Sequence, residues 1–315
     1  MISALAPIIF VLIWSTGLVS ARAVVPHASI GLFLFVRLLL SAILLAVLAF
    51  AARERWPRGL QLVRHLLAGA LLHGVYLSAA YWSVKHGMPA GIMSLIGSMQ
   101  PLVTVGAVFL IYGERPSIPT LGGLIVAIAG VACVLVPALT SSGSDHFGAF
   151  TIVVAVIAVT GMTAGTMIQR GKLSSDGVRV SASVQNAGGA IVTLAVMLAG
   201  DGYTWDGTPV LWFVLIWSVV GLSVGAVLLL VWMVRVHGAT KMSALLLAVP
   251  GLAAAEAWVL FSERLGAIQI LGFVLALVGV VVARRGASTA PAKQEQEQDR
   301  DGSRHVGSSL SATGK

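Results

Sequence analysis

Residues 100–115 read QPLVTVGAVFLIYGER, and residues 249–264 read VPGLAAAEAWVLFSER. In each stretch an apolar run separates a proline from a Glu-Arg pair thirteen residues later. Seven identities share one separation of 149 positions, and they join Pro101, Glu114, Arg115, Gly123, Ala127, Gly130 and Val131 to Pro250, Glu263, Arg264, Gly272, Ala276, Gly279 and Val280. Because a Glu-Arg pair at a fixed distance from a proline seldom recurs by chance, the chain contains an internal repeat.

The repeat lies in a chain that consists mainly of apolar runs. Of 315 residues, 57% are hydrophobic and 10% are charged, and the mean hydropathy is +0.95. A soluble domain carries about 25% charged residues, and a helix of about 20 apolar residues crosses the hydrocarbon of a bilayer. We predict an all-α membrane protein with ten transmembrane helices, at residues 4–21, 29–51, 66–84, 89–111, 118–137, 147–168, 180–199, 210–234, 241–262 and 266–283.

The repeat divides the predicted helices into two units of five. An odd number of spans brings the second unit into the membrane in the opposite sense, so we predict two inverted five-helix repeats around a central cavity. Residues 1–140 form the first unit and residues 141–286 the second. Residues 287–315 are polar and rich in Ser, Gly and Gln, and this composition predicts a disordered tail.

The net charge of +8 follows from short basic loops rather than from a nucleic-acid-binding face. With the N-terminus inside, the inner loops carry twelve Lys and Arg residues and the outer loops carry three, Arg22, Lys85 and Arg264. Cytoplasmic loops are enriched in these residues. We therefore expect a multi-pass protein of the plasma membrane with both termini cytoplasmic, whose partners are the lipid bilayer and a small-molecule substrate, with no nucleic acid. The oligomeric state stays open, and a monomer is compatible with the sequence.

Several motifs resemble those of a known family. Trp14-Ser15-Thr16-Gly17, Arg37, the stretch Gly87-Met88-Pro89-Ala90-Gly91 and the two proline-to-Glu-Arg stretches are similar to those of EamA-type transporters in the drug/metabolite transporter superfamily. The resemblance covers residues 1 to about 286 and implies a ten-helix fold that carries a small molecule across the membrane. That family includes exporters of amino acids and other metabolites.

These features together predict a secondary active transporter, a proton-coupled exporter of a small polar metabolite such as an amino acid. The chain has no Gly-x-x-x-x-Gly-Lys-Ser/Thr motif, and Cys133 is its single cysteine, so we expect no bound ATP, no metal and no other cofactor. The alternatives are an importer or a drug- or lipid-type translocator of the same fold. A membrane enzyme is disfavoured because the seven histidines form no metal-binding or catalytic pair, and all except His73 fall at loops, helix edges or the tail.

Polar side chains inside apolar helices are the candidates for the cavity wall, because they are costly in contact with lipid. The predicted substrate-cavity residues are Trp14, Ser15, Arg37, His73, Tyr76, Gln100, Gln185 and Asn186. Arg37 either binds a substrate carboxylate or clamps the structure. His73 and Tyr76 share a helix face and either line the cavity or pack against a neighbour. Tyr81, at a helix end, fits an interfacial anchor.

Two further features concern transport itself. Glu256 lies within an apolar helix, and we predict either a proton-coupling site or an ion pair with Arg37. Pro101 and Pro250 interrupt their helices, since proline has no N–H to donate, and we predict hinges there. The freed carbonyls either face the cavity or bond a neighbour.

The inverted repeat predicts that the loops at Arg115 and Arg264 lie on opposite sides of the membrane. Reporter fusions at these two positions, active on one side of the membrane only, should give opposite signals. Equal signals would contradict the inverted arrangement.

Overall fold

The computed structural model describes residues 2–140, 147–169, 173, 176–200, 202–237, 245–263 and 265–288. These residues are almost entirely helical and contain no strand, apart from an isolated antiparallel bridge between Ala28 and Trp205. Arg264 and the tail beyond Ser288 lie outside the described residues, so their predicted roles stay predictions. The predicted all-α class is confirmed.

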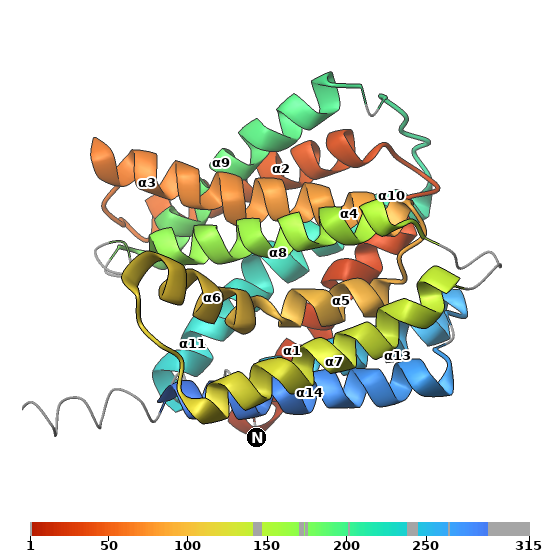
Figure 1. The fold of residues 1–315 in the computed structure, drawn as a ribbon. Coiled ribbons are helices and arrows are strands. Elements are labelled where there is room, and N and C mark those ends of the chain that lie inside the picture. The colour runs from red at the N-terminus through yellow and green to blue at the C-terminus, as the bar shows by residue number, and fades with distance from the viewer. Residues whose placement is uncertain are drawn as a thin grey trace, which may run out of the picture.

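The helices follow one another with short connections (Figure 1). In chain order they are α1 (Ile2–Val24), α2 (Ile30–Ala51), α3 (Leu60–Gly69), η1 (Ala70–Val75), α4 (Tyr76–Lys85), α5 (Ala90–Ser98), α6 (Gln100–Tyr112), α7 (Ile118–Thr140), α8 (Ala149–Gln169), α9 (Val178–Leu198), α10 (Pro209–Ile216), η3 (Trp217–Ala226), α11 (Val227–His237), α13 (Val249–Phe261) and α14 (Ala267–Ser288). The π-helical η1 joins α3 to α4, and η3 joins α10 to α11, so each set forms one continuous span.

Nine of the ten predicted spans appear in the described residues as helices long and apolar enough to cross a membrane. The ninth predicted span, residues 241–262, differs. Its described part is an apolar helix of 13 residues, α13, which follows a turn at residues 247–248, and residues 238–244 lie outside the described chain. The third span begins at Leu60 rather than at 66, so His65 lies within a helix instead of at its edge.

Each of the two prolines lies just after an interruption of its span, and their role as hinges stays a prediction. The fourth span breaks at Met99, between α5 and α6, and Pro101 is in the first turn of α6. Pro250 occupies the same place in α13. Proline is suited to a helix start because the first N–H groups of a helix have no carbonyl partner within it.

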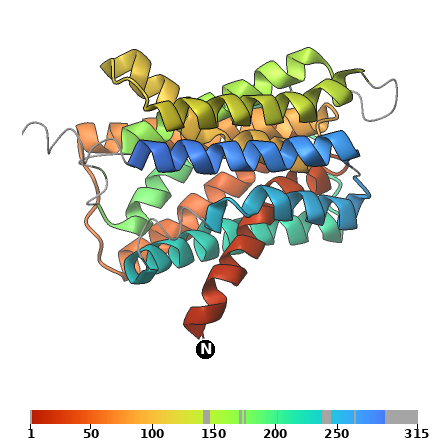
Figure 2. The ribbon, with the colours of Figure 1, turned by 60° about the horizontal axis from the view of Figure 1, so that its bottom comes forward.

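Two helix pairs join elements that are distant in the sequence. Figures 1 and 2 both show α7 and α14 side by side along their length, and α2 packs on α9. Glycines make the α7–α14 contact close. A Cβ atom at Gly130 would lie 2.3 Å from the backbone nitrogen of Ala276, and one at Gly123 would lie 2.3 Å from that of Ala283. Only glycine allows backbones to approach in this way.

Replacement of Gly123 by valine should therefore disrupt the α7–α14 contact. We expect Gly123→Val to lower the free energy of unfolding by about 1–3 kcal/mol, because backbone atoms cannot move aside as side chains do. The melting temperature in detergent, followed by tryptophan fluorescence, measures the loss. Gly122→Val is the matched control, since a Cβ atom at the adjacent Gly122 meets no atom within 4 Å. Equal melting temperatures for the two variants would show that the contact is not close.

Candidate functional site

A cavity of about 690 Å³ lies inside the helix bundle. All eight predicted cavity residues line it, namely Trp14, Ser15, Arg37, His73, Tyr76, Gln100, Gln185 and Asn186, and so do Pro101 and Pro250. Much of the remaining wall consists of leucine and valine side chains from α1, η1, η3 and α11 and from the start of α13. The eight residues come from five spans, and the polar part of the wall also includes residues that the sequence did not single out, namely Ser94, Ser98, Gln169, Asp176, Ser181, Ser223 and Arg284.

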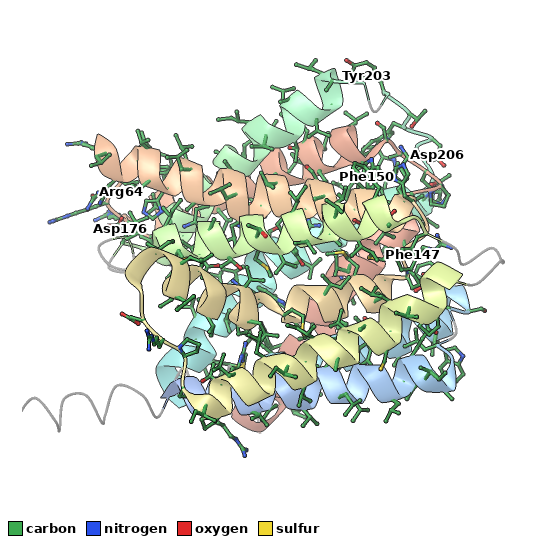
Figure 3. All side chains as sticks on the ribbon, in the orientation of Figure 1. Arg64, Phe147, Phe150, Asp176, Tyr203 and Asp206 are labelled. Carbon is green, nitrogen blue, oxygen red and sulfur yellow. The ribbon has the colours of Figure 1, made fainter. Side chains whose placement is uncertain are left out.

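The cavity reaches one end of the bundle. At one end the lining includes Leu173, Asp176 and Val178, which lie in the connection before α9 and at its start. Towards the other end the last lining residues of α1 are Gly17 and Leu18, although α1 continues to Val24. Figure 3 places Asp176 at the end of the bundle where Arg64 lies, opposite Asp206 and Tyr203. The mouth is thus on the side that the Lys and Arg distribution predicts to be cytoplasmic.

Arg37 on α2 is 6% exposed. Its Nη1 donates a hydrogen bond of 2.8 Å to the hydroxyl of Tyr81, and this hydroxyl donates one of 3.3 Å to the carbonyl of Gly17. Within the described chain its Nε has no hydrogen-bond partner. The prediction for Tyr81 was wrong: this side chain is fully buried and is no interfacial anchor, because its hydroxyl is the polar partner that the buried guanidinium requires.

Aromatic rings close the bundle beyond Arg37. The ring of Phe33 stacks on Tyr81 at 6.2 Å and on Trp205 at 6.4 Å, measured between ring centroids. Trp205 comes from the loop before α10, and it also packs edge-on against Trp212. This layer separates Arg37 from the end at which Asp206 lies.

Glu256 lies beside the cavity rather than in its wall. Its Oε1 accepts a hydrogen bond of 2.6 Å from the hydroxyl of Ser15, which does line the cavity. Among the described residues, its buried Oε2 has no hydrogen-bond partner. The alternative in which Glu256 pairs with Arg37 is wrong, because the two side chains have different partners.

The amides of the cavity bond to several helices. Nε2 of Gln100 donates to Oγ1 of Thr166 on α8 at 2.9 Å, and Nδ2 of Asn186 donates to the carbonyl of Ala182 at 2.8 Å. His73 lies in η1 and Tyr76 begins α4, and both line the cavity. The structure thus favours the wall position over packing away from the cavity for this pair.

Sequence reasoning missed a polar group at the mouth. His65 is 1% exposed, and its Nε2 lies 2.8 Å from Oδ2 of Asp176. Its Nδ1 lies 3.3 Å from Nε2 of Gln185. The spacing of His65, Gly69 and His73, four residues apart, was the available signal, since it places them on one helix face.

The loops at the closed end are joined across the bundle. The backbone N–H of Ser29 donates to the carbonyl of Thr204 at 3.0 Å, and Nδ1 of His27 lies 2.6 Å from Oδ2 of Asp206. The backbone N–H of Thr208 donates to Asp206, and together with the His27 ring and the Thr208 hydroxyl it holds the pKa of this carboxyl below its usual value. These bonds hold the loop before α2 against the loop before α10.

No group of three or more metal-ligating side chains occurs in the described part of the chain. What the arrangement offers is a buried cation, several amides and hydroxyls, and an aliphatic wall within the width of a bilayer. These features define a polytopic membrane protein with an internal cavity that polar side chains line in part.

Comparison with known proteins identifies the family. The model of the EamA-like transporter family matches residues 1–136 and again residues 149–285. The chain therefore belongs to the EamA-like transporter family, within the drug/metabolite transporter superfamily, and the predicted resemblance is confirmed. Members of this family are membrane transporters, and this chain is a multi-pass membrane protein.

More distant similarities agree with this assignment. A chloroplastic WAT1-related protein of Arabidopsis thaliana is 26% identical over 132 residues, which are 42% of this chain and 32% of the relative. The match thus spans about a third of the relative's length. A solved crystal structure covers 90% of this chain and 98% of its own with a TM-score of 0.60 and 16% identity, which shows a common fold.

The bonds to Asp206 predict a pH-dependent contribution to stability. A carboxyl whose pKa is lowered in the fold stabilises it above the unfolded pKa, and this contribution disappears as the pH falls through the folded value. Asp206→Asn should lower the melting temperature at pH 7, and the difference from the parent should shrink as the pH is lowered from 7 to 2. Melting curves in detergent between these pH values test this.

Glu114→Gln serves as the control for Asp206→Asn. Glu114 is an exposed acid in a loop, and the described residues offer it no hydrogen bond. A difference for Asp206→Asn that persists unchanged at low pH would show that the charge of Asp206 has no part in stability.

Proposed function

We propose that this transporter is a proton-coupled secondary carrier of the plasma membrane that exports a small polar metabolite such as an amino acid. One observation carries the proposal: a buried, carboxylate-free Arg37 lines a cavity that reaches only one end of the bundle. An ionisable side chain within the membrane usually marks a substrate or ion pathway. A substrate carboxylate is the partner that the guanidinium lacks among the described residues.

The pairing of helices supports two inverted repeats, residues 1–140 and 141–286. Three contacts each join helices from spans that hold the same place in the two units. They are α2–α9 between the second spans, α5–α13 between the fourth spans and α7–α14 between the fifth spans. The proline breaks also recur in the fourth span of each unit, and a π-helical segment recurs in the third span of each, where η1 begins at Ala70 and η3 at Trp217. Rocking of one such unit against the other alternates access to a central site.

The open end and the charge distribution support export as the direction of transport. The mouth lies with Asp176, on the side that the basic loops predict to be cytoplasmic, and with this orientation both termini are cytoplasmic. A substrate in the cytoplasm then reaches Arg37 without a conformational change, as an exporter requires. The aromatic layer of Phe33, Tyr81 and Trp205 has to part before release on the other side.

Glu256 supplies the proton site. Ser15 donates to its Oε1, which leaves Oε2 to take a proton in an interior where a lone carboxylate is costly. Because Ser15 also lines the cavity, it links the charge of Glu256 to the substrate. Proton release from Glu256 and substrate binding at Arg37 are thus connected through α1.

Transport by purified protein in lipid vesicles tests the proposal. We expect movement of at least one of a set of labelled amino acids when a pH gradient is imposed, and exchange of the same solute without a gradient. Glu256→Gln keeps the hydrogen bond from Ser15 but holds no exchangeable charge, so it should retain exchange and lose the acceleration by the gradient. Rates of uptake and counterflow separate the two effects.

Two results would overturn this reading. If Glu256→Gln keeps its full dependence on the gradient, Glu256 is not the coupling site. If no amino acid, organic anion or hydrophobic dye moves across a broad set of solutes, the carrier function itself is wrong. Glu114→Gln is the matched control, because it makes the same chemical change in an exposed loop.

A further inference from the structure

Four polar side chains form a continuous row at the mouth of the cavity. Nε2 of Gln169 donates to Oε1 of Gln185 at 2.6 Å, Nε2 of Gln185 lies 3.3 Å from Nδ1 of His65, and Nε2 of His65 lies 2.8 Å from Oδ2 of Asp176. Gln169, Gln185 and Asp176 line the cavity, whereas His65 is buried behind them. They come from α8, α9, α3 and the loop before α9, so the row depends on the packing of three helices.

The chemistry of the neighbours fixes the protons on His65. A carboxylate only accepts hydrogen bonds, so Nε2 carries the hydrogen that is donated to Asp176. The nitrogen of the Gln185 amide only donates, so Nδ1 must be the unprotonated acceptor. All three hydrogen bonds therefore run in one direction, from Gln169 towards Asp176, and His65 is neutral in this arrangement.

From this row the geometry points to a second proton-binding site, at His65, whose occupancy sets the orientation of the Gln185 amide in the cavity wall. When His65 takes a proton on Nδ1, that nitrogen becomes a donor and faces the NH₂ group of Gln185. Two donors cannot bond, so the Gln185 amide turns its oxygen to His65. Its NH₂ group then faces Gln169, which has to turn in the same way.

Few titratable or charged groups face His65 among the described residues. Asp176 is the charged group in contact with His65. In the described chain, three elements pack on α3, namely α8, η1 and α9. Helix α8 has no titratable side chain, and η1 has His73. Helix α9 has Arg179, whose Nη1 lies 2.9 Å from Oε1 of Glu54. On α3 itself Arg64 is exposed, and Arg284 lines the same cavity. Arg170 and Lys172 of the neighbouring loop lie outside the described residues.

The site gives the cavity two states. With neutral His65 the Gln185 oxygen points to Gln169, and with charged His65 the amide nitrogen takes that place. A solute entering past Leu173 and Asp176 thus meets a different pattern of donors and acceptors in each state. A role of this site in coupling protons to transport rests on the proposed carrier function. Proton binding at His65 itself does not depend on that function.

Solid-state ¹⁵N NMR of the full chain in lipid vesicles, labelled at its seven histidines, tests the inference with protons as the only ligand. The His65 signal is the one missing from His65→Gln, and Asp176→Asn, which alters its neighbour, confirms it independently. We expect neutral His65 with its hydrogen on Nε2 at pH 8 and doubly protonated His65 at pH 5, the range in which histidines change charge.

Two variants should move this titration to lower pH. Asp176→Asn removes the carboxylate that favours the charged ring, so half-protonation should move to lower pH by about one unit. Gln185→Leu removes the amide oxygen that turns to the charged ring, and this bond is stronger than the contact of the amide with the neutral ring, so half-protonation should move in the same direction. Asn186→Leu is the matched control and should leave the titration in place, because the Asn186 amide bonds to Ala182 of its own helix.

Three results would overturn the site: one charge state of His65 from pH 5 to 8, a neutral ring with its hydrogen on Nδ1, or a shift of half-protonation to higher pH in either variant. Failure of the carrier proposal looks different. If His65 titrates as expected but the protein transports no solute, only the carrier proposal is wrong. If the protein transports a solute but His65 does not change its charge state, only the His65 site is wrong.

Discussion

Inside a membrane protein a polar group has no bulk water to bind, so it needs a partner from the protein or a wetted cavity. Arg37 shows how this constraint organises the fold. Its guanidinium bonds the Tyr81 hydroxyl, which bonds the Gly17 carbonyl, and these contacts fix α1, α2 and α4 relative to one another. Arg37 also lines the cavity, and its buried Nε has no hydrogen-bond partner among the described residues. The same residue thus joins three helices and contributes to the cavity wall.

The helix contacts away from Arg37 are of two kinds: close backbone contacts, and contacts of helices that are interrupted near the cavity. At the α7–α14 contact the glycines bring two backbones together, and α2 is tied to α9 by a hydrogen bond of 2.8 Å from Ser183 to the carbonyl of Ala42. Around the cavity, by contrast, α5 and α6 are separated by a break and α13 starts at a proline. Close backbone contacts resist deformation, whereas a broken helix has fewer hydrogen bonds to lose. Motion is therefore expected at the cavity and not at the glycine contacts.

The two proposed proton sites differ in position and in partner. Glu256 lies beside Ser15 and close to the interior, and His65 lies at the mouth between Asp176 and Gln185. Each touches the cavity through an intermediate side chain, Ser15 or Gln185. This indirect contact lets a change of charge alter the wall without placing a charge in the path of the substrate.

The sequence determined the span pattern, the internal repeat, both proline breaks and the eight polar residues of the wall. These follow from local properties, because a bilayer demands long apolar helices and penalises any polar side chain that faces lipid. Only the tertiary structure decided the pairing of those polar groups. Tyr81 near a helix end and His65 near a predicted helix start looked peripheral, yet packing buries both, since the third span is longer than its apolar run and crosses α8 and α9. Hydrogen bonds between residues as distant as Ser15 and Glu256 depend on how helices meet, and no local pattern in the chain encodes that contact.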